Sequence, residues 1–455
     1  MAEVSLAELP IRCLCEFLGT FLLVFSVIFS KLTGHPLWSG LAIATVHMVL
    51  LQSMGKMASG IFNPAMSVAL GTVRFLGGPG LVWSQVLAMV VAQLLGAFSA
   101  ALTATVSLGK ELPVGDYMLY GVNALGICEF VYTCMICFVA LNVMSPKRNE
   151  KEKLDFYAVA IGFAVLAGVY GGNICGAMFN PAVALALDIT SPSYGFNGDG
   201  TVLSLFHLSA AYVAALLYCQ VRPQEFNKPR SEGGHFERGV SECVGSILVV
   251  LTAILNFRKG TIVGPLSVAA AMTSMAFALE DISGGHFNPA ITFAHARSGW
   301  SGRFPWYRHW LVQICGAAIA SLLAQFTLLQ QHYFGPKLPY DLTQALVSEG
   351  IFTFMLCLVS LSVTVSSGTK ASQFFGLAIG SCMIAGGYAI SSVSGGTLNP
   401  VIGLGLALTG GGLRNALAYA TSQIVSAALA AATFKVLHGE AEVKRESETD
   451  AREEF

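Results

Sequence analysis

Long apolar segments recur along almost the whole chain, and short polar turns separate them. Twelve of these segments approach the roughly 20 residues that a helix needs to cross a lipid bilayer. They are residues 12–30, 38–55, 81–107, 122–144, 155–172, 201–220, 239–256, 261–279, 307–330, 342–365, 371–390 and 413–436. The pattern predicts an all-α membrane protein with twelve spanning helices.

A second set of apolar pieces is too short to span a membrane. Each runs for about ten residues, roughly half the spanning length, and follows an asparagine. Asn is a strong helix N-cap and Pro is favoured at the first helical position, so each Asn-Pro pair predicts a helix start. The irregular loops before them are tolerated at membrane depth only where they line protein or a water-filled cavity. The four starts are Asn63-Pro64-Ala65, Asn180-Pro181-Ala182, Asn288-Pro289-Ala290 and Asn399-Pro400-Val401.

The chain repeats itself four times. Near the start of four spans, a Glu is followed four residues later by Thr or Ser, and an Asn-Pro pair follows before the next such Glu. Each quarter holds three spans and one short helix, so consecutive quarters enter the membrane in opposite orientations. Quarters one and two form one inverted pair, and quarters three and four form a second pair parallel to the first. The four glutamates are Glu16, Glu129, Glu242 and Glu349.

Inverted pairs predict what the short helices do. In transport proteins of this architecture the solute path follows the pseudo-two-fold axis. Two half-helices would meet there N-terminus to N-terminus, and each end carries about half a positive charge. Together with the asparagine amides, these ends would orient water or a hydroxyl group and repel cations.

The repeat also sets the domain boundaries. We divide the chain into a first unit (1–220), a cytoplasmic linker (221–238), a second unit (239–436) and an acidic-rich, disordered tail (437–455). Neither the linker nor the tail is long enough to form a separate catalytic domain.

Composition excludes several other classes of protein. Hydrophobic residues make up 54% of the 455 residues and charged residues only 11%, the net charge is -1, and the mean hydropathy is +0.66. Disordered proteins and nucleic-acid-binding proteins need far more charge. The sequence shows neither a His and Cys cluster with metal-ligand spacing nor a nucleophile–base pair. We therefore expect no cofactor, no metal site and no enzymatic activity.

Basic residues predict the orientation in the membrane. Most of the 25 Lys and Arg lie in the termini, the linker and the loops that the inverted repeat assigns to one face. The positive-inside rule places that face, with both termini, in the cytoplasm. The opposite face carries Lys31, Lys110, Arg258, Lys259, Lys337 and Arg414.

The repeated motifs resemble those of the aquaporin, or major intrinsic protein, superfamily. Residues 283–292, Ser-Gly-Gly-His-Phe-Asn-Pro-Ala-Ile-Thr, are similar to the first signature motif of that family. Residues 16–20 resemble the start of its first helix, and residues 93–97 and 313–317 resemble its third. A family member has six spans and two such motifs. The resemblance therefore implies two tandem aquaporin-like units, each with six transmembrane helices and two re-entrant half-helices related by an inverted repeat.

The resemblance implies roles for individual side chains. In the family, the matching Glu accepts hydrogen bonds from the re-entrant loop, and we favour this role over a proton relay for the four glutamates. His286 matches a pore-lining His of the family, whereas the first unit has Ile61 at that position.

At the outer constriction the chain departs from the family. Most members place an Arg directly after the second motif of each unit, where Val183 and Ile402 stand here. Small apolar residues in place of Arg predict a wide, apolar filter that admits glycerol or urea as well as water. Charge exclusion would then be left to the half-helix dipoles and the asparagines. The other constriction positions, counted along the repeat, are Ile43, Gly168 and Ala177, then Val268, Gly387 and Gly396.

Several functions remain open from the sequence. We favour a passive channel for water or small uncharged solutes. A secondary transporter is disfavoured because the spans hold almost no other ionisable groups. A membrane scaffold that no longer conducts would explain the missing arginines, and a weak ion leak is a further alternative, more so near Glu280 and Asp281. Family members are tetramers, so the resemblance implies a homodimer in the lipid bilayer that forms a four-pore pseudo-tetramer.

Overall fold

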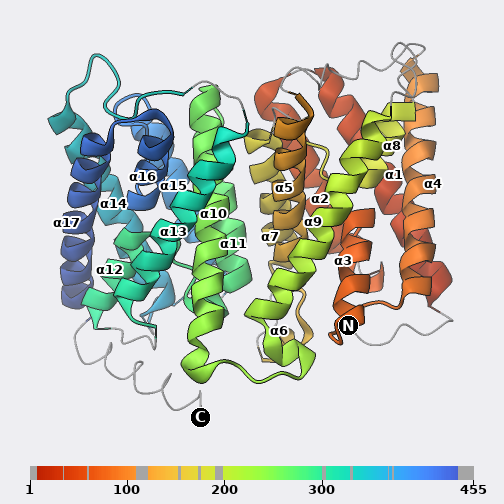
Figure 1. The fold of residues 1–455 in the computed structure, drawn as a ribbon, viewed down its shortest axis with the longest axis horizontal. Helices are drawn as coiled ribbons and strands as arrows, with labels where there is room; N and C mark the ends of the chain where they lie inside the picture. Colours follow the sequence, from red (N-terminus) through yellow and green to blue (C-terminus); the bar gives the residue numbers. More distant parts are fainter. Residues whose placement is uncertain are drawn as a thin grey trace. The chain divides into compact units, whose positions relative to one another are not determined.

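The computed structural model is a chain of helices joined by short connections (Figure 1). It describes residues 8–33, 35–58, 61–108, 121–151, 155–172, 176–189, 198–299, 304–327, 331–366, 368–370 and 373–438. These residues contain helices, turns and bends but no β-strand. Apart from residues 437 and 438, which end the last helix, the predicted disordered tail lies outside the described residues.

The chain divides into two compact units, Met1–Arg230 and Ser231–Phe455. The division falls inside the segment that the sequence assigns to a linker. That segment is partly helical: Pro223–Phe226 and Glu232–Gly234 form short 3-10 helices, η2 and η3, and α10 already begins at His235.

The first unit contains six long helices and two half-helices at the predicted places. An additional short helix, α6, follows α5 and was not predicted. The helix α2 continues to Ala58. The helices are α1 (Leu9–Thr33), α2 (Pro36–Ala58), α3 (Pro64–Phe75), α4 (Trp83–Leu108), α5 (Gly121–Val143), α6 (Pro146–Lys151), α7 (Tyr157–Gly171), α8 (Pro181–Ile189) and α9 (Asp199–Val221).

The second unit repeats this order. Its half-helices are α12 and α16, and the helix before α12 ends at Ser283. The helices are α10 (His235–Lys259), α11 (Gly264–Ser283), α12 (Pro289–Ser298), α13 (Trp306–Gln325), α14 (Leu342–Thr364), α15 (Phe375–Ile390), α16 (Pro400–Gly410) and α17 (Leu413–His438).

Nine helices among the described residues are long and apolar enough to cross a membrane. The other three predicted spans are also helical, but α7 and α15 are shorter than 18 residues, and α13 begins with a polar turn that includes Arg308 and His309. In α7 the side chains from Ala158 onward are almost all buried. This helix is therefore surrounded by protein along most of its length.

Helix packing repeats with the sequence. The first long helix of each quarter packs against the second and third of that quarter, as α1 does against α2 and α4. The second long helices pack across each pair, α2 against α7 and α11 against α15. Each half-helix packs against the third long helix of the other quarter: α3 on α9, α8 on α4, α12 on α17 and α16 on α13. Within each unit the two half-helices lie in opposite halves of the helix layer (Figure 1).

Glycines permit the closest of these contacts. A Cβ added to Gly96 on α4 would lie 2.3 Å from the carbonyl oxygen of Phe17 on α1. At the repeated position, a Cβ on Gly316 of α13 would lie 2.8 Å from the Cβ of Ser246 on α10. The first and third helices of these quarters therefore approach to backbone contact, as small residues allow in membrane helices.

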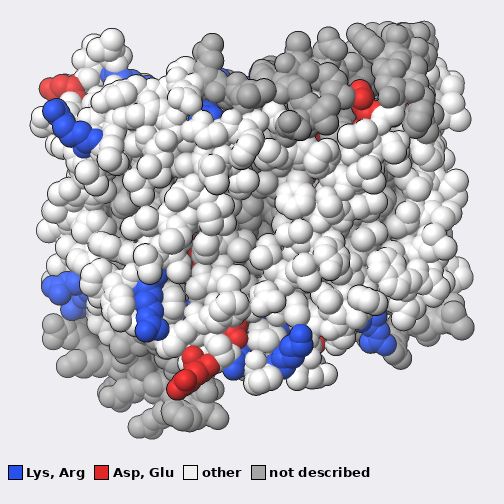
Figure 2. All heavy atoms as spheres, in the orientation of Figure 1, with Lys and Arg blue, Asp and Glu red and all other residues white. Residues whose placement is uncertain are grey.

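Large apolar side chains cover the outward faces of several helices. Within each unit, the described charged residues on the visible face lie mostly toward the two ends of the helices, with uncharged residues between them (Figure 2). This surface is what a lipid environment requires. Examples of exposed apolar residues are Leu18, Leu22, Leu87, Leu95, Leu311, Leu322, Leu417 and Leu429.

Candidate functional site

Each half-helix begins at its asparagine. Pro occupies the first helical position of α3, α8, α12 and α16. The side-chain oxygen of each Asn accepts a hydrogen bond from the backbone N–H two residues further on, which caps one of the free N–H groups of the helix start. These bonds run from Ala65 to Asn63, Ala182 to Asn180, Ala290 to Asn288 and Val401 to Asn399, at 2.8–3.1 Å.

The same asparagines tie the two half-helices of a unit together. Each Asn Nδ2 donates to the carbonyl of the residue directly before the other Asn, so the two helix starts face each other. An amide nitrogen carries two N–H groups, and this bond uses one of them. The donor and acceptor residues are Asn63 with Phe179, Asn180 with Phe62, Asn288 with Leu398 and Asn399 with Phe287, at 2.9–3.0 Å.

The residue before each Asn has an unusual backbone conformation. Its φ is positive, between 42° and 51°, which bulky L-residues rarely adopt. Its carbonyl is held by the opposite Asn, and its N–H is held by a buried glutamate. Bonds on both sides thus fix a strained conformation at all four repeats. The four residues are Phe62, Phe179, Phe287 and Leu398.

The four glutamates lie in the protein interior and bind the re-entrant loops. In the first unit, Glu16 accepts from the N–H groups of Ile61 and Phe62 at 3.1 and 2.8 Å. Glu129 accepts from the N–H groups of Met178 and Phe179 at 3.0 and 2.8 Å. Both glutamates are fully buried, so these bonds replace the water that the carboxylates have lost.

The glutamates of the second unit have more partners. Glu242 accepts from the N–H groups of His286 and Phe287, each at 2.9 Å, and from the Ser283 hydroxyl. Glu349 accepts from the N–H groups of residues 397 and 398 and from the hydroxyls of residues 394 and 397, at 2.7–3.0 Å. The geometry is that of loop supports, with every oxygen directed at a loop donor.

The sequence did not lead us to one further side chain that binds each glutamate, in addition to the loop N–H groups. A side chain from the third long helix of the same quarter reaches the glutamate at 2.8 Å in all four repeats. Three of these are Gln and one is His. Their near-constant separation from the glutamate, between 71 and 78 residues, is a signal that could have revealed them. The pairs are Glu16 with Gln93, Glu129 with His207, Glu242 with Gln313 and Glu349 with Gln423.

The hydroxyl residue four positions after each glutamate has a different environment. Among the described residues, none donates to or accepts from these four hydroxyl oxygens, although the side chains are fully buried. Their small size suits the close contact between helices, as at Ser246, which faces Gly316. The four are Thr20, Thr133, Ser246 and Thr353.

The predicted filter positions of the first unit come from three helices and one loop. Ile43 lies on α2, and Val183, 2% exposed, lies in the first turn of α8. Ala177 lies in the loop before α8 with φ 53°. Gly168 lies on α7, and a Cβ there would be 2.8 Å from the Phe179 ring, so that ring fills the space of a side chain.

In the second unit, two of the predicted filter positions touch. Val268 is on α11 and Ile402, 3% exposed, is in the first turn of α16. A Cβ on Gly396 would lie 2.8 Å from the carbonyl oxygen of Gly387, and one on Gly387 would lie 2.8 Å from Pro265. Glycine therefore brings backbone segments together at these positions. Neighbouring groups therefore occupy the space that a side chain would take at Gly387 and Gly396.

His286 lies in a group of three buried histidines. Its Nδ1 is 3.2 Å from the Thr292 hydroxyl, and its ring centroid is 4.5 Å from that of His295 and 5.1 Å from that of His309. The two further histidines were not singled out from the sequence. Within the described part of the chain, no group of His, Cys, Asp and Glu is arranged to hold a metal ion.

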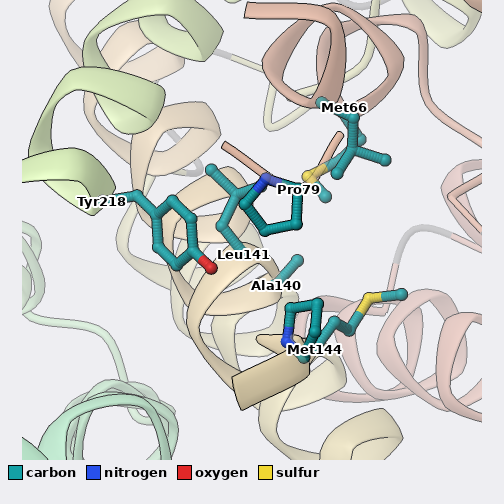
Figure 3. Close-up of a pocket in the computed structure, with 8 residues that line it drawn as sticks. Met66, Pro79, Ala140, Leu141, Met144 and Tyr218 are labelled. Atoms are coloured by element: carbon teal, nitrogen blue, oxygen red, sulfur yellow. The ribbon is translucent and has the colours of Figure 1, made fainter. Parts of the chain in front are cut away.

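A small pocket lies elsewhere in the first unit, between α3, α5 and α9 (Figure 3). It leaves about 10 Å³ for the centre of a water molecule, roughly the room that one water needs. Figure 3 shows the Tyr218 hydroxyl directed toward the side chains of Leu141 and Ala140. None of the predicted site residues is among those that line it: Met66, Leu70, Pro79, Ala140, Leu141, Met144, Pro146 and Tyr218.

Paired half-helices that meet at their N-termini inside a bundle of long apolar helices define a class of membrane protein built from inverted repeats. The chain belongs to the major intrinsic protein family. The family model matches residues 3–197 and, a second time, residues 234–434. The two matches correspond to two family units fused in tandem.

Each of the following relatives matches less than half of the chain. Over 172 residues the chain is 33% identical to aquaporin NIP1-1 of Zea mays, which covers 37% of this chain and 60% of the maize protein. It is 29% identical to the probable aquaporin TIP5-1 of Arabidopsis thaliana over 215 residues, 43% of this chain and 82% of the relative. It is 32% identical to the glycerol uptake facilitator protein-like 6 of Lactiplantibacillus plantarum over 215 residues, 44% of this chain and 98% of the relative.

Proposed function

We propose that each unit is a passive channel for water and small uncharged solutes such as glycerol or urea. The observation that carries the proposal is the meeting of two helix N-termini, joined by reciprocal asparagine bonds, inside each unit. The names of the relatives, aquaporins and a glycerol uptake facilitator, support the same substrate class.

The site acts by orienting solutes and repelling cations. The two helix ends of a unit together present about one positive elementary charge. Each Asn Nδ2 keeps a second N–H beyond the one bonded to the opposite loop, and this donor can bind a water or hydroxyl oxygen. A neutral hydrogen-bonding solute is stabilised at this point, whereas a cation is repelled.

The outer filter is apolar in both units. Val183 and Ile402 occupy the first turns of α8 and α16, where the resemblance to the family leads us to expect Arg. Their side chains lack the five N–H donors and the charge of Arg. With Ile43 and Val268, they give a constriction with apolar side chains at these four positions, which admits partly apolar solutes such as glycerol.

The assembly follows from the fused units. We propose that two chains associate as a dimer with four pores, with both termini in the cytoplasm. The outward-facing apolar residues of α1, α4, α13 and α17 supply surface for contact with lipid or with a second chain. A detergent particle that contains four chains, measured by multi-angle light scattering, would contradict the dimer.

Flux measurements test the channel. Purified protein in liposomes should pass water, glycerol and urea in light-scattering assays, and Val183→Arg with Ile402→Arg should narrow the solute range. The double variant Val183→Leu with Ile402→Leu keeps the filter apolar and controls for side-chain size. The proposed filter is wrong if the wild type passes water and rejects glycerol and urea, or if the double Arg variant has an unchanged solute range.

The same preparation distinguishes the alternatives. A scaffold without open pores would show no flux above that of protein-free liposomes. An ion-conducting pore would show a current under voltage clamp. A coupled transporter would move solute against its gradient when an ion gradient is imposed.

A further inference from the structure

A lysine reaches the filter loop of the first unit from a different helix. Lys31 is in the last turn of α1, and its Nζ donates to the carbonyl oxygen of Gly176 at 2.9 Å. Gly176 directly precedes Ala177, one of the predicted filter positions. The ammonium group is therefore bound beside the filter that lacks its Arg.

The repeated position in the second unit holds Phe257. It follows Glu242 by the same fifteen residues that separate Lys31 from Glu16, and it lies in the last part of α10. A Cβ on Gly395 would lie 3.7 Å from the Phe257 ring, and Gly395 directly precedes the filter position Gly396. The last turn of the first helix thus bonds the glycine in the first unit and lies next to the equivalent glycine in the second.

A second lysine is placed over this phenylalanine. The Nζ of Lys337 lies 5.8 Å from the centroid of the Phe257 ring, within the range of a cation–π contact. The Lys337 backbone N–H donates to the carbonyl of Val393 at 2.9 Å, which ties the lysine to the loop that leads to Gly396. The second unit therefore holds an ammonium group next to the loop that leads to its filter, on a different segment of the chain.

We infer that Lys31 and Lys337 are the filter cations of the two units and exclude cations in place of the absent arginines. Lys31 on α1 and Lys337 in residues 331–341 supply a positive charge near each filter. An Arg at position 183 or 402 is then not needed to supply it. The charge raises the energy of an approaching cation, and water and neutral solutes are unaffected by its sign. This inference rests on the proposed channel function.

Charge and hydrogen bonding can be separated at residue 31. Lys31→Gln keeps an N–H donor for the Gly176 carbonyl and removes the charge, whereas Lys31→Arg keeps both. Lys337→Gln removes the second charge. Lys259→Gln is the matched control, because Lys259 is an exposed lysine in the last turn of α10.

The readouts are the potassium-to-chloride permeability ratio, from reversal potentials in planar bilayers, and water flux in liposomes. Like-charge repulsion near a protein surface predicts that Lys31→Gln and Lys337→Gln each raise potassium permeability about tenfold or more. Water flux should stay close to that of the wild type. Currents through parallel pores add, so loss of exclusion in one unit is sufficient for detection. Lys31→Arg and Lys259→Gln should behave like the wild type.

Two results would overturn the inference alone. In the first, the Gln variants conduct water normally and exclude potassium as the wild type does. In the second, Lys31→Gln and Lys31→Arg change water flux and potassium permeability to the same extent, which would show that the shape of the side chain at residue 31 matters and its charge does not. Absence of water flux in the wild type would instead overturn the proposed channel function, and this inference with it.

Discussion

Replacing Glu349 by Gln tests the role of the buried glutamates most directly. Five donors converge on this carboxylate: two backbone N–H groups, two hydroxyls and the Gln423 amide. Gln has nearly the same shape but turns one acceptor oxygen into an NH₂ group. Because the two N–H groups bind different oxygens, either orientation of the amide leaves one backbone N–H without its acceptor.

The expected cost follows from the bonds that change. The Ser394 and Thr397 hydroxyls can rotate and accept from the new NH₂, so they lose little. An orphaned buried N–H costs about 1–3 kcal/mol, and bonds to a charged acceptor exceed neutral ones by about 1 kcal/mol each. We therefore expect Glu349→Gln to lower stability by about 3 kcal/mol. For a unit of this size, that lowers Tm by roughly 6–12 °C.

Thermal unfolding in detergent, together with water and proton flux in liposomes, measures the effect. Asp341→Asn is the matched control: it removes one charge from the same helix at its exposed N-cap, where Asn caps about as well as Asp. Glu349→Gln should lower Tm and water flux while proton flux stays unchanged. A variant with the Tm of the wild type and an altered proton flux would refute the loop-support role and favour a proton relay.

Three further predictions, with five substitutions between them, follow from the same contacts. Gly245→Ala would place a Cβ 2.1 Å from the Phe287 ring and should lower the free energy of unfolding by about 1–3 kcal/mol. Gly239→Ala in the same helix is the control: its Cβ would have no atom closer than 3.8 Å, and the free energy of unfolding should rise by about 0.5–1 kcal/mol. Denaturant or thermal unfolding compares the two variants. His207→Gln should keep the hydrogen bond to Glu129 and change Tm little, but His207→Leu should lower the free energy of unfolding by about 1–3 kcal/mol. Equal Tm values for the two variants would contradict a supporting role of His207. Asn180→Ala removes a helix cap and a bond to the Phe62 carbonyl, so it should cost about 2 kcal/mol and abolish water flux through the first unit, while flux through the second continues.

The long helices and half-helices were readable from the sequence because their signals are local. Apolar length predicts a span, and an Asn-Pro pair predicts a helix start, without knowledge of what packs nearby. The fourfold register added the pairing of half-helices, and α3 and α8 begin at the predicted residues. The short helix α6 was missed because its sequence is polar and reads as a turn.

The side chains that converge on the loops were harder to predict. Gln93 on α4 bonds Glu16 on α1, and only the repeated separation between glutamate and partner, which needs all four quarters to be compared, marks it as a partner. Lys31 was counted only as a charge on one face, although it bonds the loop at Gly176. Nor does the sequence indicate that Phe179, Gly387 and Pro265 fill the space of a side chain at the three filter glycines.

The reciprocal asparagine bonds have a kinetic consequence. A transporter that alternates its access must separate its inverted halves in every cycle, but here each half holds the backbone of the other through a buried amide. Rocking would break both bonds of a unit at once, in a site that offers no replacement partners. We therefore expect solute movement without a conformational cycle, with a low activation energy, no saturation at physiological concentrations and equal rates in both directions.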